Sequence, residues 1–273
     1  MLAFPFAKIN LGLQVLGKRP DGYHDIRSVL FPIPLHDALE AVVDNSLPLG
    51  DVKFESTGLP VPGDPQSNLC LQAVELFRQQ RELPGLRMHL HKAIPTGAGL
   101  GGGSSDGTHT LHLLNKLLDL RFTPEELHTI AARLGSDCPF FLKEQPQLAE
   151  GRGERLSPVE VDLKNHWLVL VNPGIHVSTA EVFQGMQVPS THADLVAALK
   201  APLEAWPGTV VNDLETYVFA KHPAIGAIKE ELLNKGAVYA AMSGSGSSVF
   251  GIFTEEPSEV AFLPEYRSWV FPI

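Results

Sequence analysis

A glycine-rich stretch that leads directly into a leucine-patterned segment constrains this chain more than any other feature. Five glycines lie between residues 97 and 103, and Ser-Ser-Asp, all residue types that cap helices, follows at 104–106. Leucines then recur at helical spacing over residues 111–118. Glycine lets the backbone approach a ligand closely, and a helix start offers free N–H groups at a positive dipole end. The stretch therefore predicts a phosphate-binding loop that runs into a helix.

Several other motifs share letters with this stretch. Gly97, Gly99 and Gly102 fit the G-x-G-x-x-G of dinucleotide-binding folds, but the acid near the required spacing, Asp119, ends a leucine-rich helix rather than a strand. Ser105 fits the G-x-S-x-G of hydrolases, which needs an apolar strand where this chain has glycines. The lysine of NTPase P-loops and the His-Arg-Asp and Asp-Phe-Gly of protein kinases do not occur. A flexible linker is disfavoured because linkers do not lead into a strongly periodic helix.

Composition narrows the class of protein further. The chain has 273 residues, of which 44% are hydrophobic and 19% charged, so it can form one large domain or two modest ones. A net charge of −10 argues against nucleic acid and anionic membranes as partners, whereas a nucleotide needs only a local phosphate site. The sequence has no apolar run that could span a bilayer, and its N-terminus does not resemble a signal peptide. We expect a cytoplasmic protein in which Cys70 and Cys138 are free thiols.

The pattern of apolar residues predicts a mixture of strands and helices. Thr123-Pro124-Glu125-Glu126 has the residue types of a capping box and favours a helix start. A turn and a crossing between two domains, residues 1–155 and 156–273, are expected over residues 148–160. Besides the helix after the loop, we expect helices over 68–82, 123–135 and 224–234, and strands over 4–16, 29–33, 39–43, 52–56, 86–93, 167–171, 238–242 and 248–253.

A few polar residues stand out within apolar sequence. Lys8 lies in the first strand, where an edge-strand lysine is usually solvated. Asp137 precedes Cys-Pro-Phe-Phe, and although burial would raise the pKa of its carboxyl, a nearby cation would lower it again. Read alone, this residue only caps or turns the chain. Two histidine pairs have a spacing that permits a shared metal but no third ligand nearby: His89 with His91, and His109 with His112.

Several segments together resemble the GHMP kinases, which phosphorylate small metabolites. The glycine stretch matches Pro-x-x-x-Gly-Leu-x-x-x-Ser-Ser from Pro95 to Ser105, and Gly-x-Asp-x-Pro-Phe-Phe surrounds Asp137. Ser-Gly-Ser-Gly-Ser at 243–247 is similar to the glycine turn that lies against the phosphate loop in this family. The resemblance covers most of the chain. It implies an α+β fold of two domains, an N-terminal ribosomal-protein-S5-domain-2-like α/β domain that binds ATP and a C-terminal ferredoxin-like α+β domain.

The opening of the chain resembles one branch of this family. The matching segments are Phe6–Leu11 and Pro20–His24, together with the Gly-Leu-Gly-Gly-Gly-Ser-Ser-Asp form of the loop. This resemblance implies an ATP-dependent small-molecule kinase that phosphorylates the 2-hydroxyl of 4-diphosphocytidyl-2-C-methyl-D-erythritol on the non-mevalonate route to isopentenyl diphosphate. It implies Mg²⁺ as cofactor and a monomer or homodimer. Where many relatives have alanine, this chain has Gly107, which is expected to loosen the loop at a cost of about 1 kcal/mol.

The same resemblance implies roles for single residues. Asp137 would act as general base, and Lys8 would orient the reacting groups and stabilise charge. Tyr23 and Phe183 would stack on either side of the cytosine ring, with His24 bonded to its edge. Further substrate contacts are implied for Asn10 and Thr179, and a contact with Mg²⁺ for Ser104 or Ser105. Nucleotide contacts are implied for Asn68, Lys92, Pro95, Thr96, Gly97, Ala98, Gly99, Leu100, Gly101, Gly102, Gly103, Ser104 and Ser105.

Three other functions compete with this interpretation. A second GHMP kinase with a different small alcohol is disfavoured by Tyr23-His24 and the Gly-Gly-Gly-Ser-Ser form of the loop. A metabolite sensor that lost catalysis on the same fold is disfavoured because Lys8 and Asp137 are both present. A hydrolase with Ser105 as nucleophile is separable from both, because Ser105→Ala would abolish its activity.

Overall fold

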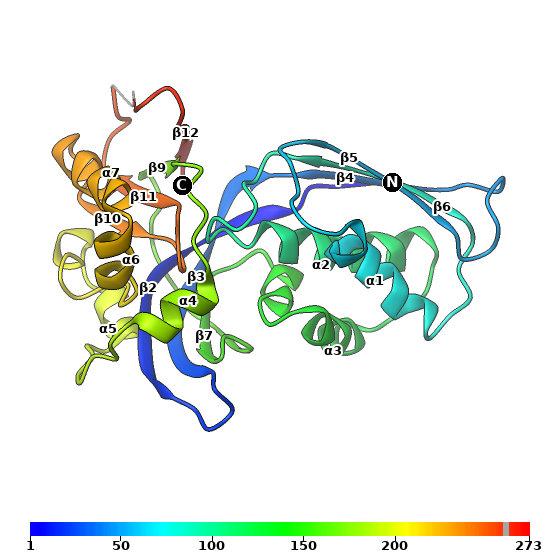
Figure 1. The fold of residues 1–273 in the computed structure, drawn as a ribbon, viewed down its shortest axis with the longest axis horizontal. Helices are drawn as coiled ribbons and strands as arrows, with labels where there is room; N and C mark the ends of the chain where they lie inside the picture. Colours follow the sequence, from blue (N-terminus) through cyan, green and yellow to red (C-terminus); the bar gives the residue numbers. More distant parts are fainter. Residues whose placement is uncertain (259–261) are drawn as a thin grey trace. The chain divides into compact units, whose positions relative to one another are not determined.

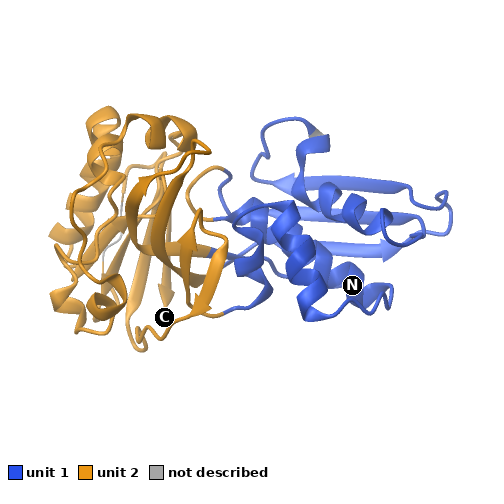
Figure 2. Cartoon of the chain, turned by 90° about the horizontal axis from the view of Figure 1, so that it is seen from below, with its two compact units in different colours: residues 1–7, 35–96, 101–144 blue, residues 8–34, 97–100, 145–273 orange. Residues whose placement is uncertain are grey.

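The computed structural model describes residues 1–258 and 262–273 of the chain (Figure 1). Contacts divide the chain into two compact units, which Figure 2 draws in blue and orange. The first unit comprises residues 1–7, 35–96 and 101–144, and the second comprises residues 8–34, 97–100 and 145–273. The glycine stretch therefore contributes residues 97–100 to the second unit and its remainder to the first.

The first unit contains a four-stranded sheet with the order β1-β4-β6-β5. β4 pairs antiparallel with β6, and β5 pairs parallel to it. Leu86, Met88 and Leu90 of β6 are buried while Arg87 and His91 are exposed, as expected for a strand with one face on the core. The strands are β1 (Leu2–Ala3), β4 (Ala38–Val43), β5 (Val52–Gly58) and β6 (Leu86–Lys92).

Helices complete the first unit and share one hydrophobic core with its sheet. Figure 1 shows them along one face of the strands. The core residues include Leu90 on the sheet, Phe77 on α1 and Leu114 on α2, all 0% exposed. The helices are α1 (Leu69–Arg78), α2 (Gly102–Leu117) and α3 (Pro124–Leu134), with the 3₁₀ turns η1 (Pro65–Ser67) and η2 (Cys138–Leu142).

The second unit contains two four-stranded sheets, with the orders β2-β3-β7-β8 and β10-β11-β9-β12. The first two residues of β2 and the last two of β3 belong to the first unit. In the second sheet, each neighbouring pair is antiparallel. The strands are β2 (Phe6–Lys18), β3 (His24–His36), β7 (Gln147–Gly151), β8 (Arg155–Pro158), β9 (Trp167–Asn172), β10 (Tyr239–Met242), β11 (Val249–Phe253) and β12 (Arg267–Pro272).

Short helices pack on these sheets and share a core with them. The core joins Leu13 and Val15 of β2 with Val171 of β9 and with Val218 and Ile228 of two helices. The helices are α4 (Thr179–Gly185), α5 (Leu195–Leu199), α6 (Glu215–Lys221) and α7 (Pro223–Asn234), with the 3₁₀ turn η3 (Leu203–Ala205).

Most predicted elements are confirmed, with differences at their ends. The capping box at Thr123 and Glu126 is present, and the first predicted helix begins after Asn68, its N-cap, but ends at Arg78 and not at 82. Residues 148–160, expected as a turn between domains, form a hairpin of β7 and β8 within the second unit. The boundary between family domains at 155/156 stays a prediction. The sequence pattern missed α5, α6 and β12, all short.

The start of α2 differs from the expectation. The sequence predicts capping residues at Ser104, Ser105 and Asp106, but the helix already begins at Gly102, and all three lie inside it. Gly101 occupies the N-cap with a left-handed φ of 69° and makes no side-chain cap. Glycine reaches this conformation without steric cost, so the backbone can enter the helix earlier than a capping serine would allow.

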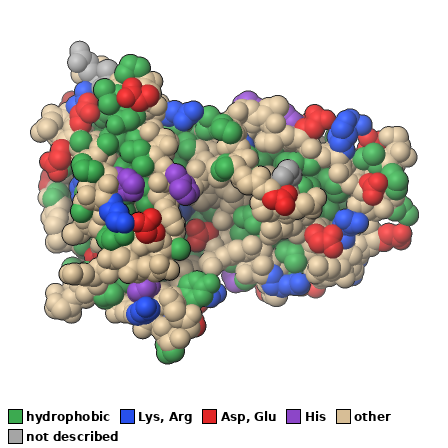
Figure 3. All heavy atoms as spheres, in the orientation of Figure 1, with side chains coloured by type: hydrophobic (Ala, Val, Ile, Leu, Met, Phe, Trp, Pro, Cys, Tyr) green, Lys and Arg blue, Asp and Glu red, His purple; other side chains and the backbone are tan. Residues whose placement is uncertain are grey.

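The surface carries charges of both signs. The net charge is −10, and on the face drawn in Figure 3 acidic and basic side chains are scattered among each other. In the described part of the chain, no helix has both the length and the apolar character that crossing a bilayer requires.

Candidate active site

The glycine loop has a backbone conformation suited to binding an anion. Gly97, Gly99 and Gly101 have φ values of 66°, 79° and 69°, so every second residue is left-handed. Alternation of this kind turns successive N–H groups toward one side and makes a concave site for negative charge. The N–H groups at the start of α2 are also available to an anion, because the first four of any helix have no partner within the helix.

Carbonyl groups of the loop are anchored to the second unit. The hydroxyl of Ser243 and the ammonium of Lys8 both donate to Gly99 O, each at 2.8 Å. Ser248 N–H donates to Ala98 O at 3.1 Å, and Lys8 N–H to Leu100 O at 3.0 Å. Three consecutive carbonyls are therefore bound to the protein. The expected contact between the 243–247 turn and the phosphate loop is confirmed.

Lys8 is buried, contrary to what its sequence position alone suggests. It is 5% exposed, and its ammonium also donates to Asn10 Oδ1 at 2.6 Å. Asn10 is fixed in turn by donating to Ser28 Oγ at 2.8 Å, and Ser28 donates to the Gly12 carbonyl at 2.6 Å. This chain of hydrogen bonds holds the ammonium in one place, where it can stabilise nearby negative charge. Both polar groups of the Asn10 amide bond to protein atoms, so its role in binding substrate stays a prediction.

Asp137 lies at the start of η2, on a backbone that its neighbours hold firmly. Its side chain is half-buried and makes no cap hydrogen bond. Cys138 is buried, and its carbonyl accepts a hydrogen bond from Thr108 on α2 at 2.9 Å. The ring of Phe141 lies 5.3 Å from that of Phe6. A partly exposed carboxylate on a rigid turn can accept a proton from a bound alcohol.

Two serines in the first turn of α2 differ in access. Ser105 is 0% exposed, and its hydroxyl lies 3.3 Å from His109 Nδ1. Ser104 is half-buried and is hydrogen-bonded to the Cys138 thiol. Burial lowers the pKa of His109 to about 4, so the imidazole beside Ser105 is neutral. Of the two hydroxyls, that of Ser104 fits better as a ligand for a cation carried by phosphate, because Mg²⁺ prefers accessible oxygen.

Lys92 is held by two carboxylates beneath the start of α2. It is 2% exposed, and it forms ion pairs with Asp37 and with Asp106, the latter at 2.7 Å. Burial alone would lower the pKa of Lys92, but the two carboxylates outweigh it and raise that pKa. Its ammonium therefore stays charged. The side chain of Asn68, the other residue expected near the nucleotide base, accepts a hydrogen bond from Cys70 N–H at 2.9 Å.

The residues expected around the cytosine lie in one aromatic pair and one cation–π pair within the second unit. The ring of His24 stacks on Phe183 with 5.3 Å between centroids. Tyr23 is 57% exposed, and the guanidinium of Arg152 lies 4.5 Å from its ring centroid. Burial, together with Lys18, lowers the pKa of His24, which favours the neutral ring. Flat, partly exposed rings of this kind can stack on a base.

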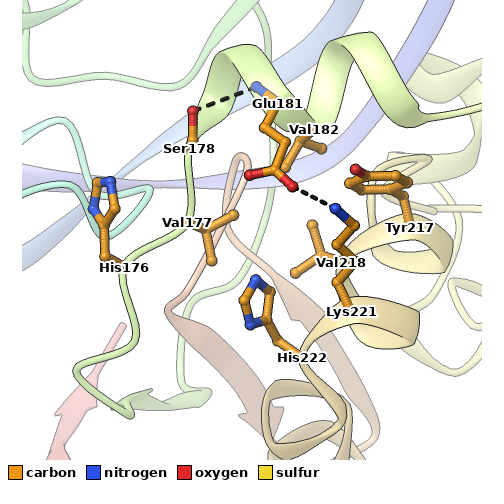
Figure 4. Close-up of a pocket in the computed structure, with 9 residues that line it drawn as sticks. All are labelled: His176, Val177, Ser178, Glu181, Val182, Tyr217, Val218, Lys221 and His222. Carbon is orange, nitrogen blue, oxygen red and sulfur yellow. Dashed lines mark hydrogen bonds and ion pairs between the residues drawn. The ribbon is translucent and has the colours of Figure 1, made fainter.

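A separate pocket is lined by residues of α4 and α6 (Figure 4). It has a volume of about 150 Å³, and Figure 4 shows the ion pair of Glu181 with Lys221, 2.5 Å long, beside Val177 and Val218. Pockets for small ligands usually measure roughly 300–1,000 Å³. We therefore place the candidate site at the glycine loop. Thr179, at the start of α4, bonds Ser245 with 2.7 Å between hydroxyl oxygens.

The two histidine pairs show no metal site. Among the described residues, no group of three or more His, Cys, Asp or Glu side chains could hold a metal ion. His89 and His91 instead both lie 3.0 Å from the hydroxyl of Thr57.

Sequence reasoning missed several residues that shape the site. Ser243 was seen only as part of a glycine turn, yet its hydroxyl fixes Gly99. Asp37 was not considered, although its carboxylate accepts the N–H groups of Ala93 and Ile94 just before the loop. Asp37 follows a long strand of ordinary pattern, so the sequence carries no signal for it.

Two family models match the chain. Residues 68–145 match "GHMP kinases N terminal domain" and residues 195–264 match "GHMP kinases C terminal". The first match contains the glycine loop and Asp137, and the second contains the 243–247 turn.

Curated relatives and a solved structure agree with these matches. A 4-diphosphocytidyl-2-C-methyl-D-erythritol kinase from Bacteroides fragilis is 47% identical over 94% of this chain and 93% of its own length. The kinase of the same name from Cytophaga hutchinsonii is 47% identical over 94% of both chains. A crystal structure of 4-(cytidine 5'-diphospho)-2C-methyl-D-erythritol kinase superposes with a TM-score of 0.78 at 31% identity, covering 94% of this chain and 91% of the other.

Proposed function

We propose a function for this chain from its family, because it belongs to the GHMP kinases and, among them, to the 4-diphosphocytidyl-2-C-methyl-D-erythritol kinases. We infer that it transfers the γ-phosphoryl group of ATP to the 2-hydroxyl of 4-diphosphocytidyl-2-C-methyl-D-erythritol. The products are the 2-phosphate and ADP. The reaction belongs to the non-mevalonate route to isopentenyl diphosphate. The observation that carries the proposal is identity of 47% with kinases of this name over nearly the whole chain.

Phosphoryl transfer depends mainly on positioning and on stabilising charge. We propose that the N–H groups of the loop and of the first turn of α2 bind the triphosphate. The left-handed glycines and the anchored carbonyls support this assignment, because they turn the amide groups of the loop into one preformed site. Binding to groups that are already ordered avoids an entropic cost when the nucleotide arrives.

The proton and the developing charge need separate groups. We assign Asp137 as the base that accepts the proton of the 2-hydroxyl. The oxygen of that hydroxyl forms the new bond to the γ-phosphorus, and the bond between the γ-phosphorus and the ADP oxygen breaks. We assign Lys8 as the cation that stabilises charge on the moving phosphoryl group, supported by its fixed ammonium. General-base catalysis of this kind contributes about 10²–10⁴-fold to the rate.

We propose Mg²⁺ as cofactor, and the hydroxyl of Ser104 would be its protein ligand, because Mg²⁺ prefers oxygen donors. When bound, it would neutralise negative charge on the phosphates. The described residues offer no acidic cluster that could hold the ion without nucleotide.

The cytidine part of the substrate is assigned to the second unit. We propose that the base stacks between Tyr23 and Phe183 and bonds to His24. In the structure His24 lies against Phe183, so the base would have to displace one ring. Binding energy at this distant group would orient the 2-hydroxyl for reaction.

The test is ADP release from the purified chain with ATP, Mg²⁺ and 4-diphosphocytidyl-2-C-methyl-D-erythritol. We expect substrate-dependent ADP, and a fall in kcat of about 10²–10⁴-fold for Asp137→Asn with little change in either KM. Asp162→Asn, at an exposed aspartate remote in sequence, is the matched control and should behave as wild type.

Other outcomes point to specific alternatives. ADP release with a different small alcohol, and not with this substrate, would contradict the substrate assignment while retaining the kinase. A well-folded chain that binds ATP but releases no ADP with any alcohol would contradict catalysis and favour a metabolite sensor.

A further inference from the structure

A buried cluster of three charges lies in the first unit next to the start of α2, and the proposed reaction gives it no role. Lys92, at the end of β6, donates hydrogen bonds to Asp37 and to Asp106. The three side chains are 2%, 0% and 5% exposed. A charge buried this deeply costs free energy unless it is well paired, so the geometry of such a cluster is tightly fixed.

Each carboxylate connects Lys92 to one end of the loop segment. Asp37 Oδ1 accepts hydrogen bonds from the N–H groups of Ala93 at 2.6 Å and Ile94 at 2.9 Å. These two residues directly precede Pro95. Asp106 is the fifth residue of α2, and its Oδ2 accepts a hydrogen bond from Lys92 Nζ at 2.7 Å. One ammonium group therefore determines where the backbone leaves β6 and where it enters the helix.

The helix start packs directly on this cluster. A Cβ added to Gly102 would lie 3.3 Å from Lys92 Nζ and 2.8 Å from Ile94 Cγ2. With such close packing, the first turn of α2 cannot move toward β6, and the ion pair of Asp106 prevents it from moving away. The N–H groups that the proposed function uses for phosphate are in this turn.

We propose that Lys92 is a positioning residue for the nucleotide, which acts through Asp37 and Asp106 on the loop and the start of α2 without touching the nucleotide. The inference rests on the proposed function, because it assumes that this loop binds ATP. It differs from the role that the family resemblance implies for Lys92, which is a direct contact.

Exposure and partners favour the indirect role. The ammonium is 2% exposed and already bonds to two carboxylates. Burial and Asp37 raise the pKa of Asp106, while Lys92 opposes that rise. Asp106 Oδ1 is buried without a hydrogen-bond partner in the described part of the chain, so this carboxyl depends on Lys92 for its position.

The test compares variants by ADP affinity, measured calorimetrically, and by steady-state kinetics. For Lys92→Met we expect a rise of about 10-fold or more in the Kd for ADP and the KM for ATP, because small displacements of binding groups have large effects. The KM for the alcohol should stay within about two-fold. A general loss of structure would instead raise the KM values of both substrates. Asp106→Asn keeps an oxygen that accepts from Lys92, and it should stay close to wild type.

Arg87→Met is the matched control. Arg87 lies on the same strand and also pairs with an aspartate, Asp44, at 2.7 Å, but it does not touch the cluster. Its removal should leave ADP affinity unchanged. Circular dichroism checks that each variant is folded.

Asp106→Ala tests the proposal independently, because it leaves the pair of Lys92 and Asp37 intact. We expect it to weaken ADP binding, and it decides the question if Lys92→Met does not fold. Wild-type ADP affinity in folded Asp106→Ala would overturn the proposal. A loss of ADP affinity in Lys92→Met that Asp106→Ala does not share would identify Lys92 as a direct nucleotide contact. Failure of the proposed function would appear differently, as absence of ADP release by the wild type.

Discussion

Replacing Gly99 with alanine tests the anchoring of the loop most directly. Gly99 has a φ of +79°, which costs an L-residue about 1–2 kcal/mol. The added Cβ would lie 1.9 Å from the carbonyl oxygen of Ser243. Because ordinary contacts begin near 3.4 Å, the loop and the 243–247 turn would have to separate by roughly 1.5 Å.

That separation breaks the hydrogen bonds to Gly99 O. The bond from Ser243 Oγ and the charged bond from Lys8 Nζ are both 2.8 Å long. Their net contributions are about 1 and about 2 kcal/mol. Together with the backbone strain, we expect the free energy of unfolding to fall by about 4–5 kcal/mol. We expect kcat/KM to fall by about 10²-fold or more, since the amide groups of the loop move with it.

Urea unfolding followed by circular dichroism measures the first effect, and ADP release measures the second. Gly17→Ala is the control, because its Cβ would meet no heavy atom within 4 Å and its φ is not left-handed. Its free energy of unfolding should stay within about 0.5 kcal/mol of wild type. If Gly99→Ala were as stable and as active as Gly17→Ala, the anchoring of the loop carbonyls would not matter as we argue.

Three further predictions concern the first unit. Burial lowers the pKa of His109 to about 4 from 6.5, so between these pH values the unfolded chain takes up a proton that the folded chain does not. The free energy of unfolding should therefore fall by up to roughly 3 kcal/mol as pH decreases from 6.5 to 4. An unchanged pH dependence of this free energy in His109→Gln would refute this. Gly107→Ala should lower stability by about 1–3 kcal/mol in thermal unfolding, because its Cβ would lie 2.8 Å from Leu134 Cδ2; a rise in Tm would contradict this. Burial raises the pKa of the Cys138 thiol to about 11, and Cys70 is fully buried, so mass spectrometry should find neither alkylated by iodoacetamide until urea is added; rapid labelling of the native chain would show that one is accessible.

The case of Gly107 shows how local propensity can mislead. The sequence predicts that glycine here costs about 1 kcal/mol relative to alanine and loosens the loop. In the structure this position packs against Leu69 and Leu134, where a methyl group has no room. Close approach of helices requires a small residue, and that requirement comes from the neighbouring helices.

Lys8 gives the converse example. Its sequence position suggests a surface lysine, and only the family resemblance indicates otherwise. Its ammonium bonds to Gly99, 91 residues away along the chain, and the N–H group of Asn10 bonds to Ser243, 233 residues away. No pattern within a short window can predict such partners.

Features that depend on neighbouring residues can be predicted from the sequence. The glycine loop before a helix, the capping box at Thr123 and the alternating strands all follow from steric and hydrogen-bonding preferences over a few positions. The folded chain alone reveals that Lys8 is buried, that Lys92 bonds to Asp37 and Asp106, and that Ser243 holds the loop. The reason is physical: a polar group can be buried only where distant segments supply its hydrogen bonds, and folding alone brings those segments together.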